Sequence, residues 1–307
     1  MRGVFTELVE RLQIKGVQFE ELYSLEPGCL APLAPVYGII FLFKYGKLDS
    51  TVELQAGEYD EDAQNIFFAH QRIQNACATQ AVLNVLMNRD DVELGPVLSG
   101  FKEFVSSFDA ELKGETISNS DEIRLVHNSF SSPNMFIDDT KPPRKATDDD
   151  DVYHFVGYVR SQGLLYELDG LRPYPIVHDV CEDDDEFMEK IPEILAQRIA
   201  RSGGELRFSV LAMVKDRREV YQEIGDENSA AMEQHKRDQW KSENEMRRKD
   251  HIGLVHQIIK TYAKTATDEQ WNESIKRANG KGVARVMGNK FKNLDLSSLQ
   301  QSNAFKQ

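Results

Sequence analysis

Cysteine is scarce in this chain of 307 residues, which contains three, at positions 29, 77 and 181. Three widely spaced cysteines cannot form the disulfide framework of a small secreted protein. None stands at zinc-ligand spacing from another cysteine or from one of the seven histidines. The composition therefore predicts no metal site, and it favours a reducing compartment, the cytoplasm or the nucleus.

Long apolar runs are also missing. The longest, residues 36–43, has the length of a strand and falls far short of the roughly 18 residues that suggest a membrane-spanning helix. Near the start of the chain, Glu7 and Glu10 interrupt the apolar pattern, which argues against a secretory signal and a transit peptide. We therefore expect no membrane partner.

Basic residues are few in the first two thirds of the chain. Residues 1–215 contain 20 Lys and Arg against 37 Asp and Glu, a net charge of −17, whereas residues 216–307 contain 17 against 14, a net charge of +3. A strongly acidic domain repels phosphate backbones, so nucleic acid is not expected as a ligand. The charge favours a basic partner or substrate tail, although ordinary solubility charge explains much of the same excess.

A helical pattern begins at Cys77. Ala81, Val82, Val85 and Leu86 recur at helical spacing, and no Pro or Gly interrupts them. Cys77 is thus expected in the first turn of a core-facing helix, where unpaired backbone N–H groups and the helix dipole stabilise an anion. A thiolate at that position is a nucleophile at neutral pH. The alternative interpretation is a small buried core cysteine.

Gln71 precedes this cysteine by six residues. Its side-chain amide can donate a hydrogen bond beside the backbone N–H of Cys77, and the two donors together would form an oxyanion hole. A single Gln is also typical of a solvated surface.

Two segments rich in β-branched and aromatic residues, 152–159 and 164–171, flank a turn and predict a hairpin. If the turn is symmetric about the bond between residues 161 and 162, paired residue numbers sum to 323, and His154 faces Asp169. A carboxylate in that place fixes the tautomer of the imidazole and stabilises the imidazolium. A loop longer by one residue would break this direct register.

Several segments together resemble one known family. They include GVFTEL, PVYGIIFLFK, NACATQAV, SNSDEIRLVHNSF, HFVGYV and LYELDGLRP. Over roughly residues 3–225 the chain is similar to the ubiquitin carboxyl-terminal hydrolases, which are papain-like cysteine proteases. The similarity is close to the proteasome-associated members, which have a long helical C-terminal extension.

The resemblance implies an α/β (α+β) papain-like cysteine protease fold. Its central antiparallel sheet is flanked by helices, its backbone is knotted, and a helical C-terminal extension follows. By the same resemblance, Cys77 is the nucleophile and His154 is the general base and proton donor. Asp169 orients His154, and Gln71 completes the oxyanion hole that stabilises the transition state. No cofactor is implied.

The implied function is that of a deubiquitinase. The reaction is thiol-dependent hydrolysis of peptide or isopeptide bonds after the C-terminal Gly of ubiquitin, with ubiquitin and ubiquitin chains as partners. The expected location is the cytoplasm and the nucleus. The rival hypothesis is a ubiquitin-binding adaptor whose catalytic residues are misaligned or controlled by a partner. The presence of all four residue types argues against a relic site.

The chain is predicted to have three parts. A catalytic domain spans residues 1–215, a helical extension spans 216–280, and a basic tail at 281–307 is expected to be disordered. Within the first part, residues 138–151 are almost devoid of apolar side chains and predict an exposed, flexible loop. The resemblance implies that this loop crosses over the active site, where it would admit an extended polypeptide but not folded ubiquitin.

The extension contains an apolar helical face too thin to fold alone, so it needs a partner surface. That face consists of Ile252, Leu254, Val255, Ile258, Ile259 and Tyr262. The resemblance implies docking to the proteasomal ubiquitin receptor of the regulatory particle or to a chromatin-remodelling subunit. The alternative is an intramolecular helical hairpin on the catalytic domain.

Other patterns predict helices at residues 4–13, 96–112 and 121–130, the last capped by the run Ser118-Asn119-Ser120. Strands are expected at residues 36–44 and 206–214.

Overall fold

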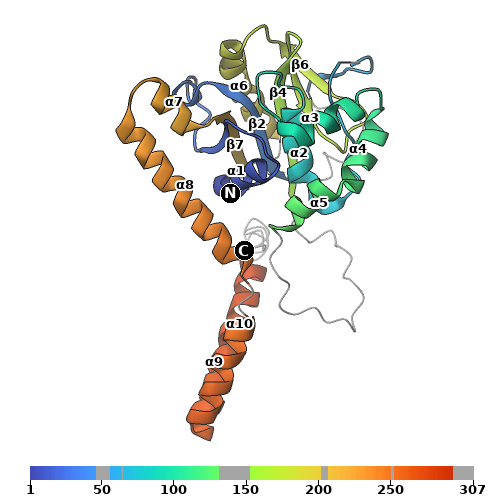
Figure 1. Cartoon of the computed structure of the whole chain (residues 1–307). Helices are drawn as coiled ribbons and strands as arrows, with labels where there is room; N and C mark the ends of the chain where they lie inside the picture. Colours follow the sequence, from blue (N-terminus) through green and yellow to red (C-terminus); the bar gives the residue numbers. More distant parts are fainter. Residues whose placement is uncertain (46–55, 64, 131–152, 202–206, 250–251, 293–307) are drawn as a thin grey trace, which may run out of the picture. The chain divides into compact units, whose positions relative to one another are not determined.

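The computed structural model describes residues 1–45, 56–63, 65–130, 153–201, 207–249 and 252–292 (Figure 1). The chain divides into two units, Met1–Lys249 and Asp250–Gln307. The expected crossover loop at 138–151 and residues 293–307 of the expected tail lie outside the described residues.

An antiparallel sheet forms the centre of the first unit. Within the described residues its order is β1-β7-β2-β4-β5-β6-β3, and every neighbouring pair is antiparallel. The bounds are β1 Val17–Leu22, β2 Val36–Lys44, β3 Glu58–Tyr59, β4 Tyr153–Ser161, β5 Leu164–Leu168, β6 Ile176–Val180 and β7 Ser209–Lys215. The bounds of β2 agree with the predicted strand. Because β2 lies between β7 and β4 with both faces covered, its sequence is almost continuously apolar.

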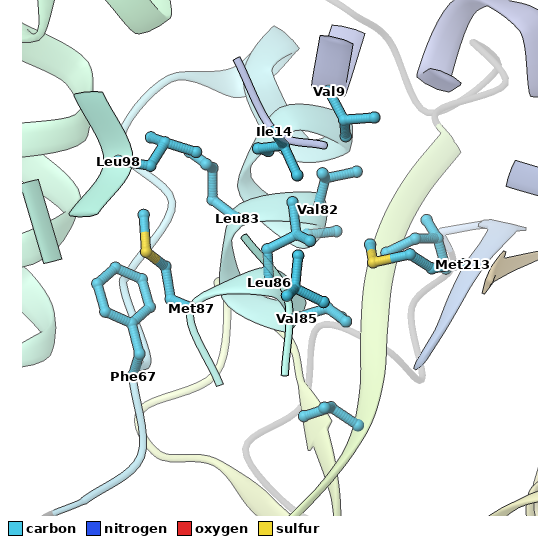
Figure 2. Packing of buried hydrophobic residues seen from close by; sticks show 14 of the residues in the cluster. Val9, Ile14, Phe67, Val82, Leu83, Val85, Leu86, Met87, Leu98 and Met213 are labelled. Atoms are coloured by element: carbon cyan, nitrogen blue, oxygen red, sulfur yellow. The ribbon is translucent and has the colours of Figure 1, made fainter. Parts of the chain in front are cut away.

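Helices cover both faces of the sheet. Side chains of α1 (Arg2–Arg11) and α2 (Cys77–Leu86) share one core cluster with Leu211 and Met213 of β7. The alternate residues Val210 and Ala212 share the other cluster with α6 (Asp184–Arg201). Figure 2 shows Val82, Leu83, Val85 and Leu86 of α2 in the first cluster, together with Val9, Leu98 and Met213.

Two glycines let α2 lie directly on the sheet. A Cβ atom on Gly38 of β2 would lie 2.5 Å from Cγ1 of Val85, and one on Gly157 of β4 would lie 2.6 Å from Cγ2 of the same residue. Such distances are far below van der Waals contact, so only glycine fits at these two positions. The close approach fixes the distance between α2 and β4.

The predicted helix at 96–112 is wrong, because two helices occupy this region. They are α3 (Gly95–Phe104) and α4 (Ala110–Asn119). The side chain of Asp109 accepts a hydrogen bond from the N–H of Leu112 at 2.7 Å and so caps a new helix where a continuous one was expected. The cap predicted within residues 118–120 is confirmed at Ser120, whose hydroxyl accepts from the N–H of Ile123 at the start of α5 (Asp121–Asn128).

The β4–β5 hairpin is confirmed, but its predicted register is wrong. Ser161 pairs with Leu164, so paired residue numbers sum to 325 and the turn consists of Gln162 and Gly163 alone. Both turn residues have positive φ, 53° and 75°, as a two-residue type I′ turn requires. The right-handed twist of the strands favours this tighter turn over a symmetric four-residue one.

The first unit continues past residue 215 into α7 (Arg217–Glu223) and α8 (Glu227–Arg248). Helix α8 packs on α1, where Asn244 donates to the carbonyl of Gly3 at 3.0 Å. Buried Arg237 donates to buried Asp216 at 2.8 Å. These contacts place the first part of the expected extension in the same unit as the sheet.

The second unit contains α9 (Ile252–Thr265) and α10 (Asp268–Lys292). Helix α10 includes residues 281–292, where the sequence predicts disorder. Within the described residues, no helix is long and apolar enough to cross a membrane.

We predict that Gly157→Ala forces α2 away from β4 and lowers the free energy of unfolding by about 1–3 kcal/mol, because the added methyl group overpacks the core. Urea denaturation measures this change. The matched control is Gly100→Ala in α3, where an added Cβ meets nothing within 4 Å. The control should be neutral or stabilise the protein by up to about 1 kcal/mol. Equal losses in both variants would contradict the close-approach argument.

Candidate active site

Cys77 is the first residue of α2, directly after the 3-10 turn η2 (Gln74–Ala76). Its side chain is half-buried. The two other cysteines are poor nucleophiles. Burial raises the pKa of the Cys29 thiol, and burial raises the pKa of the Cys181 thiol to about 11.

His154 lies on β4 and is 4 % exposed. Its Nε2 is 2.7 Å from Oδ1 of Asp169, and its other hydrogen-bond partner is the side chain of Cys77. Because Nε2 is engaged by the carboxylate, Nδ1 is the ring nitrogen that remains for the sulfur. Burial lowers the pKa of His154, but its hydrogen bonds to Asp169 and Cys77 and their negative charges outweigh burial and raise the pKa to about 9.

Aromatic rings enclose this imidazole. The rings of Phe43 and Tyr45 meet the ring of His154 edge-on, with centroids 5.8 Å and 5.5 Å away. They fix its orientation and keep water from its faces. The sequence analysis did not identify either residue, although the pairing of Phe43 with His154 follows from the β2–β4 register.

Asp169 follows the last residue of β5 and is fully buried. It is not a cross-strand partner of His154, because the register that sums to 325 ends at the pair Gly157 and Leu168. The contact arises where the chain leaves the ladder and turns. The N–H of Leu171 donates to Oδ1 of Asp169 at 3.0 Å, which holds the carboxylate in this turn.

The backbone of Gln71 lies next to this turn and is hydrogen-bonded to it. Its N–H donates to the carbonyl of Gly170 at 2.8 Å. A Cβ atom on Gly170 would lie 3.0 Å from that nitrogen, so glycine permits the close approach. The four residues predicted from the sequence come from three separate parts of the chain. Gln71 lies beside the turn that follows Asp169, Asp169 contacts His154, and His154 contacts Cys77.

Within the residues that the structure describes, no group of three or more His, Cys, Asp or Glu side chains could hold a metal ion. The chemistry available to the convergent residues is nucleophilic attack by sulfur, assisted by a buried acid and base.

We predict that Asp169→Asn lowers the pKa of His154 from about 9 towards the ordinary value of about 6.5, because the variant loses the negative charge. An NMR titration of the histidine ring protons measures it. The His127 resonance is an internal control, since that ring contacts Thr79 and should not move. An unchanged His154 pKa would contradict the assigned role of Asp169.

The same shift has a consequence for stability. Because the folded-state pKa of His154 lies above the unfolded value, its protonation stabilises the folded protein fully below about pH 6.5. This contribution is lost as the pH rises through about 9.

Comparison with known proteins agrees with this geometry. The family described as "Ubiquitin carboxyl-terminal hydrolase, family 1" matches residues 2–200, and a C-terminal family described as "Ubiquitin carboxyl-terminal hydrolases" matches residues 224–266. Ubiquitin carboxyl-terminal hydrolase 2 of Schizosaccharomyces pombe is 43 % identical over 289 residues, covering 91 % of this chain and 94 % of the relative. Ubiquitin carboxyl-terminal hydrolase isozyme L5 of Dictyostelium discoideum is 43 % identical over 221 residues, covering 72 % of this chain and 62 % of the relative.

Solved structures give the same result. The crystal structure of the Trichinella spiralis UCH37 catalytic domain bound to ubiquitin vinyl methyl ester is 36 % identical, has a TM-score of 0.60, and covers 70 % of this chain and 93 % of that one. A second structure, of UCH37 from the same organism with the same ligand, has a TM-score of 0.59 at 31 % identity and covers 80 % of this chain and 96 % of that one. The papain-like fold expected from the sequence is confirmed. The chain belongs to the ubiquitin carboxyl-terminal hydrolase family and is a cysteine-type deubiquitinating hydrolase.

Proposed function

We propose that Cys77, His154, Asp169 and Gln71 perform hydrolysis of the peptide or isopeptide bond after the C-terminal Gly of ubiquitin. The observation that supports this most directly is the continuous contact from the Cys77 sulfur through the His154 ring to the Asp169 carboxylate. A neutral thiol beside a neutral imidazole would be a weak nucleophile. Here the imidazole is placed to take the thiol proton, and the raised pKa of His154 favours the imidazolium that results beside the sulfur.

In the acylation step the Cys77 sulfur forms a bond to the carbonyl carbon of the terminal Gly, and the carbonyl electron pair moves to oxygen. The side-chain amide of Gln71 and the backbone N–H of Cys77 donate to that oxyanion. Collapse of the intermediate breaks the bond to nitrogen, and the His154 imidazolium gives its proton to the leaving amine. The product is a thioester.

In the deacylation step a water molecule gives a proton to neutral His154 and attacks the thioester. The bond to sulfur breaks, the thiolate is regenerated, and the C-terminal carboxyl group of ubiquitin releases its proton to solvent and leaves as a carboxylate. Asp169 holds the ring in one orientation through both steps, and it stabilises the imidazolium whenever the ring has accepted a proton.

The rival function is a ubiquitin-binding adaptor with a misaligned site. The simultaneous contact of His154 with Asp169 and Cys77 favours the enzyme, because a misaligned site would not bring these three side chains together. A ubiquitin C-terminal electrophile, ubiquitin vinyl methyl ester, separates the two. Covalent capture at Cys77 supports hydrolysis, whereas tight binding without capture supports the adaptor.

Cys77→Ala should abolish release of a fluorophore from a ubiquitin–fluorophore conjugate and leave ubiquitin affinity nearly unchanged, because only the nucleophile is removed. Cys29→Ala and Cys181→Ala are the matched controls and should keep turnover. Turnover retained by Cys77→Ala, together with its loss in either control, would show that another thiol is the nucleophile.

The proposal extends to partner docking through α9. Its apolar side chains Leu254, Val255, Ile258 and Ile259 are between 42 % and 60 % exposed. A row of this kind on one helix is typical of a helix that binds in a groove of a partner. The partner we propose is the ubiquitin receptor of the proteasome regulatory particle, with a chromatin-remodelling subunit as the alternative. Both imply a location in the cytoplasm and the nucleus.

Deletion of residues 250–307 should preserve cleavage of the small fluorophore conjugate, because the first unit ends at Lys249. Association with purified proteasome regulatory particles should be lost in a pull-down. In the full-length chain Ile258→Asp should have the same effect, while Gln257→Glu on the same helix should not. Association that survives both the deletion and Ile258→Asp would assign docking to the first unit.

A further inference from the structure

Three amide side chains follow one another along α2 and the turn after it. Gln80, Asn84 and Asn88 are spaced four residues apart, so they lie on one side of the helix. Gln80 and Asn84 are buried, and Asn88 is partly buried. Buried amides require hydrogen-bond partners. All three of these side chains bond to one segment of backbone.

That partner is the backbone just before the candidate oxyanion residue. Asn88 accepts from the N–H of Phe67 at 2.7 Å and donates to its carbonyl at 2.8 Å. Asn84 accepts from the N–H of Ala69 at 3.1 Å, and Gln80 donates to the carbonyl of Ala69 at 2.8 Å. The helix therefore satisfies both polar backbone groups of two alternate residues, much as a neighbouring strand would.

The spacing of the two partners explains why this arrangement fits. Four helical residues rise by about 6.0 Å, and two residues of an extended chain advance by about 6.6–6.8 Å. The segment runs antiparallel to α2, since Phe67 meets Asn88 and Ala69 meets Asn84. By the same spacing, Gln71 lies level with Gln80, about one turn from Cys77 at the start of the helix.

The segment is also held on the side away from these amides. The N–H of His70 donates to the carbonyl of Ala110 at 2.8 Å. A Cβ atom on Gly114 would lie 2.0 Å from the carbonyl oxygen of His70, so α4 packs directly on this backbone. Ala69 is thus fixed by α2 on one side, while its neighbour is fixed by α4 on the other.

We propose that Asn84 and Gln80 are positioning residues for the hydrolysis. By fixing Ala69 they set the place of the Gln71 amide relative to Cys77, so the inference rests on the oxyanion role proposed for Gln71. An apolar side chain at either position leaves the Ala69 backbone without that partner and lets the segment shift. A displacement of about 1 Å can cost about 100-fold in rate.

The experiment compares Asn84→Leu, Gln71→Ala and the double variant with a ubiquitin–fluorophore conjugate. We expect Asn84→Leu to lower kcat by about 10- to 100-fold with KM changed less than about twofold. The rate at which iodoacetamide alkylates Cys77 should stay within about twofold, because alkylation forms no oxyanion. The double variant should be no slower than Gln71→Ala, since Asn84 acts only through Gln71.

Leu195→Ala is the control for loss of stability, since this buried side chain belongs to the core cluster on the opposite face of the sheet. It should destabilise the protein without lowering kcat below the unfolding temperature. An unchanged kcat in Gln71→Ala would overturn the proposed oxyanion role itself. A reduced kcat in Gln71→Ala, with an unchanged or additive effect of Asn84→Leu, would overturn the positioning role alone.

A second variant covers the case in which Asn84→Leu does not fold. Gln80→Leu removes the 2.8 Å bond to the Ala69 carbonyl and keeps Asn84, whose amide donates to the same carbonyl only at the longer distance of 3.4 Å. It should show the same loss in kcat, and Gln80→Glu should not restore activity, because a carboxylate cannot donate to that carbonyl. Recovery in Gln80→Glu would contradict the inference.

Discussion

The contact between α2 and the sheet is the constraint on which the active site depends. Gly38 and Gly157 leave room for Val85 between β2 and β4, so α2 cannot move closer or rotate without collision. Four fully buried side chains of α2 add about 1.5–3 kcal/mol each to this packing. The helix begins with Cys77 and β4 contains His154, so a contact in the core determines how a sulfur and an imidazole meet.

A second constraint comes from charge in a buried place. An imidazolium with 4 % exposure is unfavourable unless anions surround it. The pKa of His154 of about 9 corresponds to about 3 kcal/mol in favour of the protonated form, supplied against the cost of burial by Asp169 and Cys77. The protonated state of His154 therefore depends on its contacts with Asp169 and Cys77. Loss of either partner removes part of the stabilisation that offsets burial, and so lowers the pKa of the ring.

The sequence predicted what depends on local pattern, and it missed what depends on close approach. The strand at residues 36–44 and the helix that begins at Cys77 follow from periodicity and agree with the structure. The contact of His154 with Asp169 was expected for the wrong reason, since the type I′ turn places Asp169 beyond the ladder. Nothing in the local pattern around Gly157 indicates that a helix from another part of the chain touches it.

Basic residues after position 216 form ion pairs with acidic residues near the N-terminus. Lys236 and Arg237 of α8 pair with Glu20 and Glu10 near the N-terminus, at 2.7 Å and 3.1 Å. Part of the negative excess before residue 216 is therefore neutralised within the first unit. Because those acids face α8, they are not available to attract a basic substrate tail. Any electrostatic attraction for such a tail must come from acidic residues on other surfaces of the unit, and the total charge overstates it.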